Sequence, residues 1–78
     1  MKVNGKEVDQ AVIDACIERM KQGPFKAMEI EALCTRMGID WKSGDAMRVA
    51  DRIIQRERKA GNVKIWHRPY WRWLGDAA

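Results

Sequence analysis

The sequence holds few of the side chains that carry out chemistry. Its 78 residues include one histidine, one serine and one threonine. No glycine-rich phosphate loop occurs, and His67 has neither a second histidine nor a cysteine near it at metal-ligand spacing. We therefore expect no enzyme, no metal, no cofactor and no small-molecule substrate. Only a pairing of His67 in space with Cys16 or Cys34 would supply a nucleophile and a base, and cysteines buried in helices are usually inert.

Long apolar runs are also missing. No stretch approaches the about 20 residues of a membrane-spanning helix, and residues 1–10 hold no apolar segment of the signal-peptide type. Two cysteines, Cys16 and Cys34, are too few for a disulfide framework, and both lie on apolar faces of predicted helices. We expect a cytoplasmic protein with no membrane partner, in which both thiols are buried and reduced rather than bridged.

The length and composition describe one small globular domain. A chain that is 46% hydrophobic and 33% charged has the balance of a folded protein rather than a disordered one. At this size only about 60% of the surface that the unfolded chain exposes becomes buried, so stability requires a well-packed core. We expect a single domain over 1–78, with 75–78 as a short polar tail.

The excess of positive charge lies in the second half of the chain. The net charge is zero over residues 1–25, −1 over 26–40, +3 over 41–61 and +2 over 62–78, for a total of +4. A one-sided field of this kind attracts polyanions such as nucleic acids. It is also compatible with a role in solubility alone.

The stretch from Ser43 to Gly61 predicts an amphipathic helix with two different faces. At about 100° per residue its apolar residues fall on one side, namely Ala46, Val49, Ala50, Ile53 and Ile54. The opposite side carries Arg48, Arg52, Gln55 and Lys59. Ser43 is the expected N-cap and Gly61 the expected stop. An arginine-rich line suits the major groove of DNA, although a basic helix face is more often only a solvated surface.

Two more helices are expected before this one. The first begins at residue 7 or at Asp9, a candidate N-cap, and ends before Gly23-Pro24. The second spans 27–37, and its apolar residues recur at helical spacing: Ile30, Leu33, Cys34 and Met37. Phe25, between the two helices, is expected to anchor the core.

The pattern changes to alternation after Gly61. Residues 62–66 and 70–74 each alternate in polarity, and residues 67–69 between them have the composition of a turn. This predicts a β-hairpin at the C-terminal end. Residues 1–3 are expected to form a further short strand.

Three helices followed by a hairpin, with a two-faced third helix, resemble the winged-helix superfamily over essentially the whole chain. The resemblance implies an α+β fold, mostly helical, in which the second and third helices form a helix-turn-helix and the hairpin is the wing. The N-terminal run 1–3 would supply a third strand beside the hairpin. The segments MKVNGKEV and ADRIIQRERKAGNVKIW also resemble those of small phage- and prophage-encoded proteins, which implies a DNA-binding, regulatory or accessory role.

The winged-helix resemblance implies duplex DNA as the partner, with RNA not separable from it on this sequence. The residues expected to contact the nucleic acid are Arg48, Arg52, Gln55, Arg56, Lys59, Lys64, Arg68 and Arg72. Arg48 and Arg52 are expected at bases or phosphates, and Gln55 is a candidate reader of adenine. Arg56 and Lys59 are expected at phosphates. The positive charge of the wing would come from Lys64, Arg68 and Arg72, with Arg68 at the tip. The oligomeric state stays open.

The aromatic residues allow a different function. Trp71 and Trp73 are expected in the core, because a domain of this size needs their large apolar area. Trp41, Trp66 and Tyr70 are expected to be partly exposed. They would contact a sugar or base, or form the docking surface of a winged-helix protein–protein adaptor.

Glu57 interrupts the apolar stripe of the third helix. Since an unpaired buried carboxylate is unfavourable, we expect either a partner or an exposed helix end. One hypothesis is a bond to an indole N–H or to Arg72, which would fix the hairpin to the helix.

Overall fold

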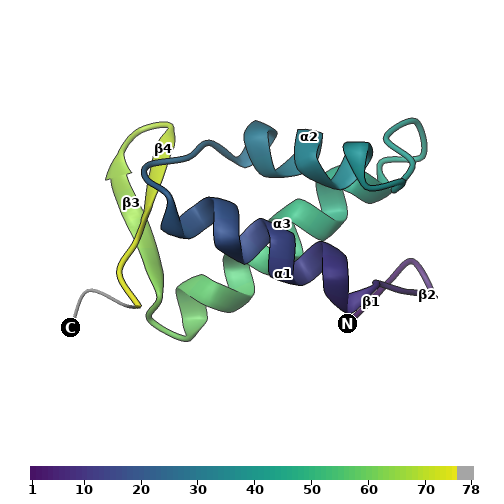
Figure 1. The fold of residues 1–78 in the computed structure, drawn as a ribbon, viewed down its shortest axis with the longest axis horizontal. Coiled ribbons are helices and arrows are strands. Elements are labelled where there is room, and N and C mark those ends of the chain that lie inside the picture. The colour runs from purple at the N-terminus through teal and green to yellow at the C-terminus, as the bar shows by residue number, and fades with distance from the viewer. Residues whose placement is uncertain (76–78) are drawn as a thin grey trace.

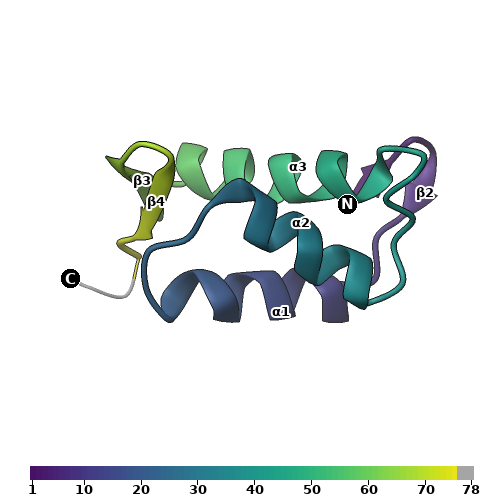
Figure 2. The same ribbon diagram turned by 90° about the horizontal axis from the view of Figure 1, so that it is seen from above.

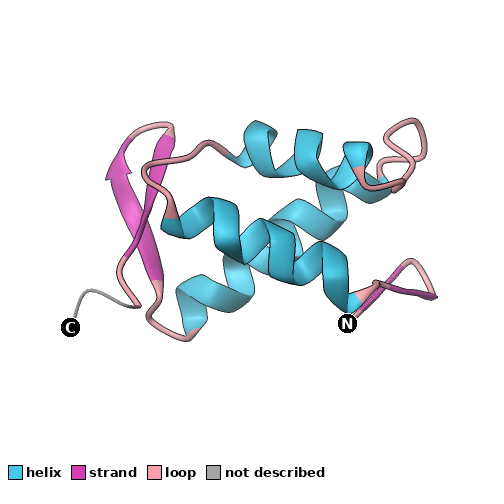
Figure 3. Ribbon diagram, in the orientation of Figure 1, coloured by secondary structure: helices cyan, strands magenta, loops and turns pink. Residues whose placement is uncertain are grey.

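The computed structural model describes residues 1–75 and contains three helices and two antiparallel strand pairs (Figures 1 and 3). The elements in chain order are β1 (Lys2–Val3), β2 (Lys6–Glu7), α1 (Gln10–Lys21), α2 (Ala27–Arg36), α3 (Asp45–Lys59), β3 (Val63–His67) and β4 (Tyr70–Trp73). A small, mostly helical α+β fold is therefore confirmed. Of the expected tail 75–78, residues 76–78 lie outside the described residues.

The helices are arranged around one core, with a strand pair toward each end of the molecule. Figure 2 shows α1 and α3 on opposite sides with α2 between them. The β3–β4 hairpin stands at one end of the long axis, and the β1–β2 hairpin lies toward the other end (Figures 1 and 2). The loop from α2 to α3 lies at the same end as β1–β2.

The helix ends follow the local sequence with one exception. Asp9 caps α1 as predicted, because its carboxylate accepts a hydrogen bond from the Ala11 N–H at 3.3 Å. Gly61, with φ of 83°, ends α3 as predicted. The prediction of Ser43 as the N-cap of α3 is wrong, since the cap is Gly44 with φ of 85°. The Ser43 hydroxyl still accepts a hydrogen bond from the Asp45 N–H at 3.3 Å, although Ser43 is one residue before the N-cap.

The core is formed by apolar residues of all three helices and of the segments between them. Phe25, the expected anchor, is fully buried. The stripe of α3 is buried as predicted: Ala46, Val49, Ala50, Ile53 and Ile54. Met37 was expected on the apolar face of the second helix, but α2 ends at Arg36 and Met37 is exposed at its end.

The C-terminal hairpin is antiparallel, with Val63 opposite Trp73 and Ile65 opposite Trp71. Trp71 and Trp73 are half-buried and pack against the core, as expected. β3 continues to His67, one residue into the expected turn. The register of the pair is irregular between Ile65 and His67.

The N-terminal strand does not join this hairpin. β1 confirms the short strand expected at residues 1–3. It pairs with β2, however, so the expected position of this strand beside the C-terminal hairpin is wrong. The reason is local: Asn4 and Gly5 adopt φ of 52° and 75°, which turns the chain back on itself. The position beside β4 is occupied by Phe25. Its N–H donates to the Trp71 carbonyl at 3.0 Å, and the Trp71 N–H donates to the Phe25 carbonyl at 2.7 Å.

We predict that Phe25→Ala lowers the free energy of unfolding by about 3–5 kcal/mol, because it leaves a cavity in the core. This is a large part of the roughly 4–12 kcal/mol expected for a chain of this length. Chemical denaturation followed by circular dichroism measures it. Met28→Ala, at an exposed position, is the control and should change stability by less than about 0.5 kcal/mol. Equal effects of the two substitutions would contradict this account of the core.

Candidate nucleic-acid interface

The polar face of α3 is open to solvent along most of its length. Because its apolar stripe is buried against the rest of the domain, the residues opposite that stripe point outward. Arg48, Arg52, Arg56 and Lys59 are exposed, and Gln55 is half-buried. The five α3 residues predicted from the sequence are thus present at the surface.

The N-terminal hairpin lies against this face, which the sequence did not indicate. The Arg48 guanidinium donates to the Asn4 side-chain oxygen at 3.1 Å. The Arg52 guanidinium donates to the Lys2 carbonyl oxygen at 3.4 Å. Each guanidinium has five N–H donors, so both retain donors for a ligand while the hairpin orients them.

Strand β1 and the second half of α3 together form an open cleft of about 400 Å³. Its lining residues are Met1, Lys2, Arg52, Gln55, Arg56 and Lys59. Four of these are cations and none is acidic. Ammonium and guanidinium groups on an open surface suit phosphate oxygens, which Lys and Arg contact through charge-assisted hydrogen bonds. Lys2 is the cation that sequence reasoning missed, because nothing in residues 1–7 indicated where the hairpin packs.

Two contacts within this cleft limit what its residues can do. The Gln55 side-chain oxygen accepts from Arg58 Nε at 2.8 Å, so reading adenine with both amide groups requires that bond to break. Arg56 forms an ion pair with Glu57 at 3.0 Å. Lys2, Arg52 and Lys59 form no ion pair within residues 1–75 and are the cations best placed for a phosphate.

The hairpin is attached to α3 through Asp45. Asp45 is buried in the first turn of α3, and its carboxylate accepts from Asn4 Nδ2 at 2.5 Å and from Lys6 Nζ at 3.2 Å. These hydrogen bonds, the one from Asn4 first, lower the pKa of Asp45 below its ordinary value. The contact therefore places β1 beside α3 and positions Lys2 at the cleft.

Glu57 has a similar role at the other end of α3. Glu57 is buried with a partner on each oxygen: Arg56 Nε donates to one at 3.0 Å and Asn62 Nδ2 to the other at 2.9 Å. The hypothesis of an indole or Arg72 partner is wrong, and so is the alternative of an exposed helix end. The reason is the tight turn at Gly61, which brings Asn62 back over the last turn of α3. The Asn62 carbonyl then accepts from the Leu74 N–H at 2.6 Å. Asn62 immediately precedes β3 and Leu74 immediately follows β4, so Asn62 connects Glu57 to the open end of the hairpin.

The predicted wing cations lie on the C-terminal hairpin and are exposed. Lys64 and Arg72 are opposite each other in the register, and Arg68 lies in the turn between β3 and β4. The peptide bond between Arg68 and Pro69 is cis. These residues are carried by a different element from the cleft residues, so the predicted contacts form two groups, one on α3 and one on the hairpin.

The exposed aromatic residues do not form one surface. Trp41 is in the α2–α3 loop, whereas Trp66 and Tyr70 are on the hairpin at the other end of the long axis (Figure 1). A single docking surface made of all three is therefore excluded. The Trp73 indole N–H is buried and has no hydrogen-bond partner within residues 1–75.

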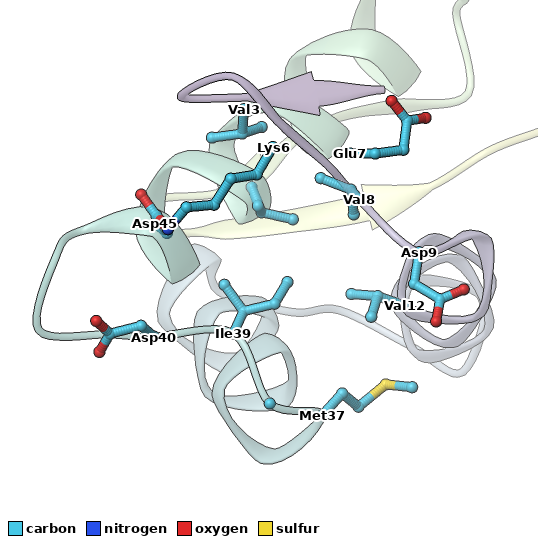
Figure 4. Close-up of a pocket in the computed structure, with 12 residues that line it drawn as sticks. Val3, Lys6, Glu7, Val8, Asp9, Val12, Met37, Ile39, Asp40 and Asp45 are labelled. Atoms are coloured by element: carbon cyan, nitrogen blue, oxygen red, sulfur yellow. The ribbon is translucent and has the colours of Figure 1, made fainter.

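A second cavity, of about 320 Å³, lies between the N-terminal hairpin, α1 and the start of α3 (Figure 4). Its walls are largely apolar, with valine and isoleucine side chains from several segments. Four acidic residues, Glu7, Asp9, Asp40 and Asp45, also line it, with Lys6 as the one cationic residue in the lining. This charge balance does not suit a polyanion, so the cavity is not part of the candidate interface.

The pairing of His67 with a cysteine does not occur. Cys16 and Cys34 are fully buried between α1 and α2, with their sulfur atoms 3.7 Å apart. The hydrogen bond between the thiols, together with burial, raises the pKa of Cys16. His67 is exposed on β3. Residues 1–75 hold no group of three His, Cys, Asp or Glu side chains suited to a metal ion, and none of their helices has the length and apolar character to cross a membrane.

Comparisons of the chain with protein-family models, with curated proteins and with solved structures found no match.

We predict that Asp45 makes stability pH-dependent on the acid side. Since its folded-state pKa is lowered, its contribution is full above the ordinary carboxyl pKa and is lost as pH falls through the lower folded-state value. Urea denaturation of the protein and of Asp45→Asn over a pH series measures this. The gap in unfolding free energy between them should be widest near neutral pH and shrink in acid. A gap that does not vary with pH would contradict the role given to Asp45.

Proposed function

We propose that this protein is a winged-helix module that binds duplex DNA. Two features of the fold support the winged-helix assignment. The second and third helices are followed at once by an antiparallel hairpin, which is the element order of that superfamily. Phe25, from the segment between α1 and α2, pairs with Trp71 of β4 and so provides a third extended segment beside the hairpin.

The observation that carries the proposal is the cleft between β1 and α3. Lys2 and Arg52 are 50 residues apart in the sequence. Both nevertheless line, together with Lys59, one open surface without a carboxylate. Such a surface would follow a phosphate backbone, and α3 would enter the major groove along it. Arg48, nearer the start of α3, is the proposed base-reading residue, because Asn4 holds its guanidinium at the edge of that face.

The C-terminal hairpin extends the proposed interface beyond the helix. Lys64, Arg68 and Arg72 are exposed on it, and a wing of this kind would contact the phosphates that flank the groove. The Glu57–Asn62 contact fixes where the hairpin begins relative to α3. We propose a regulatory or accessory role on DNA for the whole domain.

A protein–protein adaptor is the second candidate function. The observation that favours it is a set of large apolar side chains left exposed on α2, on the α2–α3 loop and at the start of α3: Met28, Trp41 and Met47. Exposed apolar residues in one region are typical of protein contact sites. Under this function the cations of α3 would be dispensable, and Trp41 would be required.

We predict that a fluorescein-labelled duplex binds the protein with an affinity that falls steeply with salt. Each phosphate contact contributes a slope of about −0.9 in log K against log salt, so four contacts give roughly −3.6. Arg52→Ala with Lys59→Ala should reduce that slope by about 1.8 and weaken binding at low salt. Fluorescence anisotropy at several salt concentrations measures both quantities.

The matched control is Arg36→Ala with Lys42→Ala, which removes the same charge from exposed positions outside the cleft. It should leave the salt slope within about 0.5 of the original value. Equal losses in the two double variants would mean that only net charge matters. Absence of duplex binding at low salt would refute the proposed function, and loss of a protein partner on Trp41→Ala would support the adaptor.

A further inference from the structure

The two faces of the β3–β4 hairpin differ in composition: one packs tryptophans against the core, and the other carries cations. Residues opposite each other in the register share a face. Val63 with Trp73 and Ile65 with Trp71 belong to the face whose tryptophans pack against the core. Lys64 and Arg72 are opposite each other on the other face, which points away from the helices.

The same hairpin also carries an indole ring that is exposed to solvent, that of Trp66. The register irregularity between Ile65 and His67 leaves Trp66 without a partner in the ladder, and such bulges re-aim a side chain. Trp66 is 51% exposed. The His67 ring packs edge-on against it, with the ring centres 5.4 Å apart and the planes at 79°. The His67 ring thus contacts the indole, while much of the indole surface remains uncovered.

A second aromatic ring lies on the same face. Tyr70 precedes Arg72 by two residues and therefore shares its face, and it is 36% exposed. The Lys26 ammonium, from the segment before α2, lies 5.6 Å from the centre of the Tyr70 ring. Lys26 is therefore a third cation beside the hairpin, in addition to Lys64 and Arg72.

The charge on this face is unbalanced. Residues 58–75 contain no aspartate or glutamate. Like charges placed directly opposite each other in a strand pair are destabilising, so the Lys64–Arg72 pair weakens the isolated hairpin. A bound polyanion would remove that repulsion. The ligand that this face suits must therefore carry negative charges and present flat rings to Trp66 and Tyr70.

We infer that the outer face of the β3–β4 hairpin is a binding site for unpaired nucleotides. A base stacks on Trp66, and Lys64 and Arg72 contact the flanking phosphates. The bases inside a duplex are stacked on both faces, so the ring that can stack on Trp66 is that of an unpaired base at a fork or in a single-stranded extension. This inference rests on the proposed function, since α3 would hold the adjoining duplex, and it implies a preference for duplexes that carry a single-stranded extension.

Two DNA ligands with equal numbers of phosphates test the inference: a blunt duplex, and a shorter duplex with a single-stranded thymidine extension. The protein should bind the extended duplex at least about fivefold more tightly in fluorescence anisotropy, because stacking on an aromatic side chain is worth about this factor or more per base. Trp66→Ala should abolish the preference and leave blunt-duplex binding as it was. Trp66→Phe should retain most of the preference.

Trp41→Ala is the matched control and should keep the preference intact. It removes an indole that is also more than half exposed, in the α2–α3 loop at the other end of the molecule. In the unaltered protein, the NMR signal of the Trp66 indole N–H should shift on addition of oligothymidine, and that of Trp41 should not. This second measurement does not depend on whether a variant folds.

The outcomes separate this site from the proposed function. Binding of both ligands with equal affinity, and no effect of Trp66→Ala, would overturn the inference and leave the duplex-binding proposal standing. Failure to bind either ligand would refute the proposed function. Trp66-dependent binding to vesicles of phosphatidylserine and phosphatidylcholine, without any preference among the DNA ligands, would assign the hairpin face to a lipid surface and overturn the inference.

Discussion

The burial of one stripe of α3 determines where every candidate contact lies. Ala46, Val49, Ala50, Ile53 and Ile54 are all buried in the core, and this fixes the rotation of the helix about its axis. The arginines and Lys59 then have only one direction available, which is outward. Burial of this apolar area is the main favourable contribution to folding in so small a domain. The same interaction that stabilises the fold therefore also displays its positive charge.

Two buried carboxylates attach the two hairpins that carry the other candidate contacts to this helix. Asp45 and Glu57 are the buried charged residues among residues 1–75, and they lie in the first and last turns of α3. Asp45 holds the N-terminal hairpin through Asn4 and Lys6, and Glu57 holds Asn62 at the start of the C-terminal hairpin. Each carboxylate has hydrogen-bond donors on its oxygens, which offsets the unfavourable burial of its charge. The positions of Lys2 and of the C-terminal hairpin relative to α3 follow from these two contacts.

Much of the fold could be predicted because it depends on local patterns. The period of the apolar residues indicated all three helices, and the alternation after Gly61 indicated the hairpin. The partner of β1 could not be predicted, since pairing depends on which segments meet in space. The contact between Phe25 and Trp71 joins residues far apart in the sequence through backbone groups alone. Because every residue has these groups, the residue types do not indicate the contact.

The candidate site was predicted in part for the same reason. The cations of α3 share a face through helical spacing, and spacing is visible in the sequence. The partner of Glu57 and the contribution of Lys2 depend on how the chain turns at Gly61 and on how the hairpin packs, and both are tertiary properties. Expected exposure also grouped Trp41 with Trp66 and Tyr70, although the fold places Trp41 in the α2–α3 loop and the other two on the C-terminal hairpin.

An NMR titration of the isotope-labelled protein with a blunt DNA duplex at low salt would locate the proposed DNA-binding surface residue by residue. We expect the largest amide shifts in β1 and along the outer face of α3, at Lys2, Arg52 and Lys59. The α2–α3 loop around Trp41 should change little. Shifts centred on Trp41 and Met28, or no shifts at all, would contradict the proposed surface.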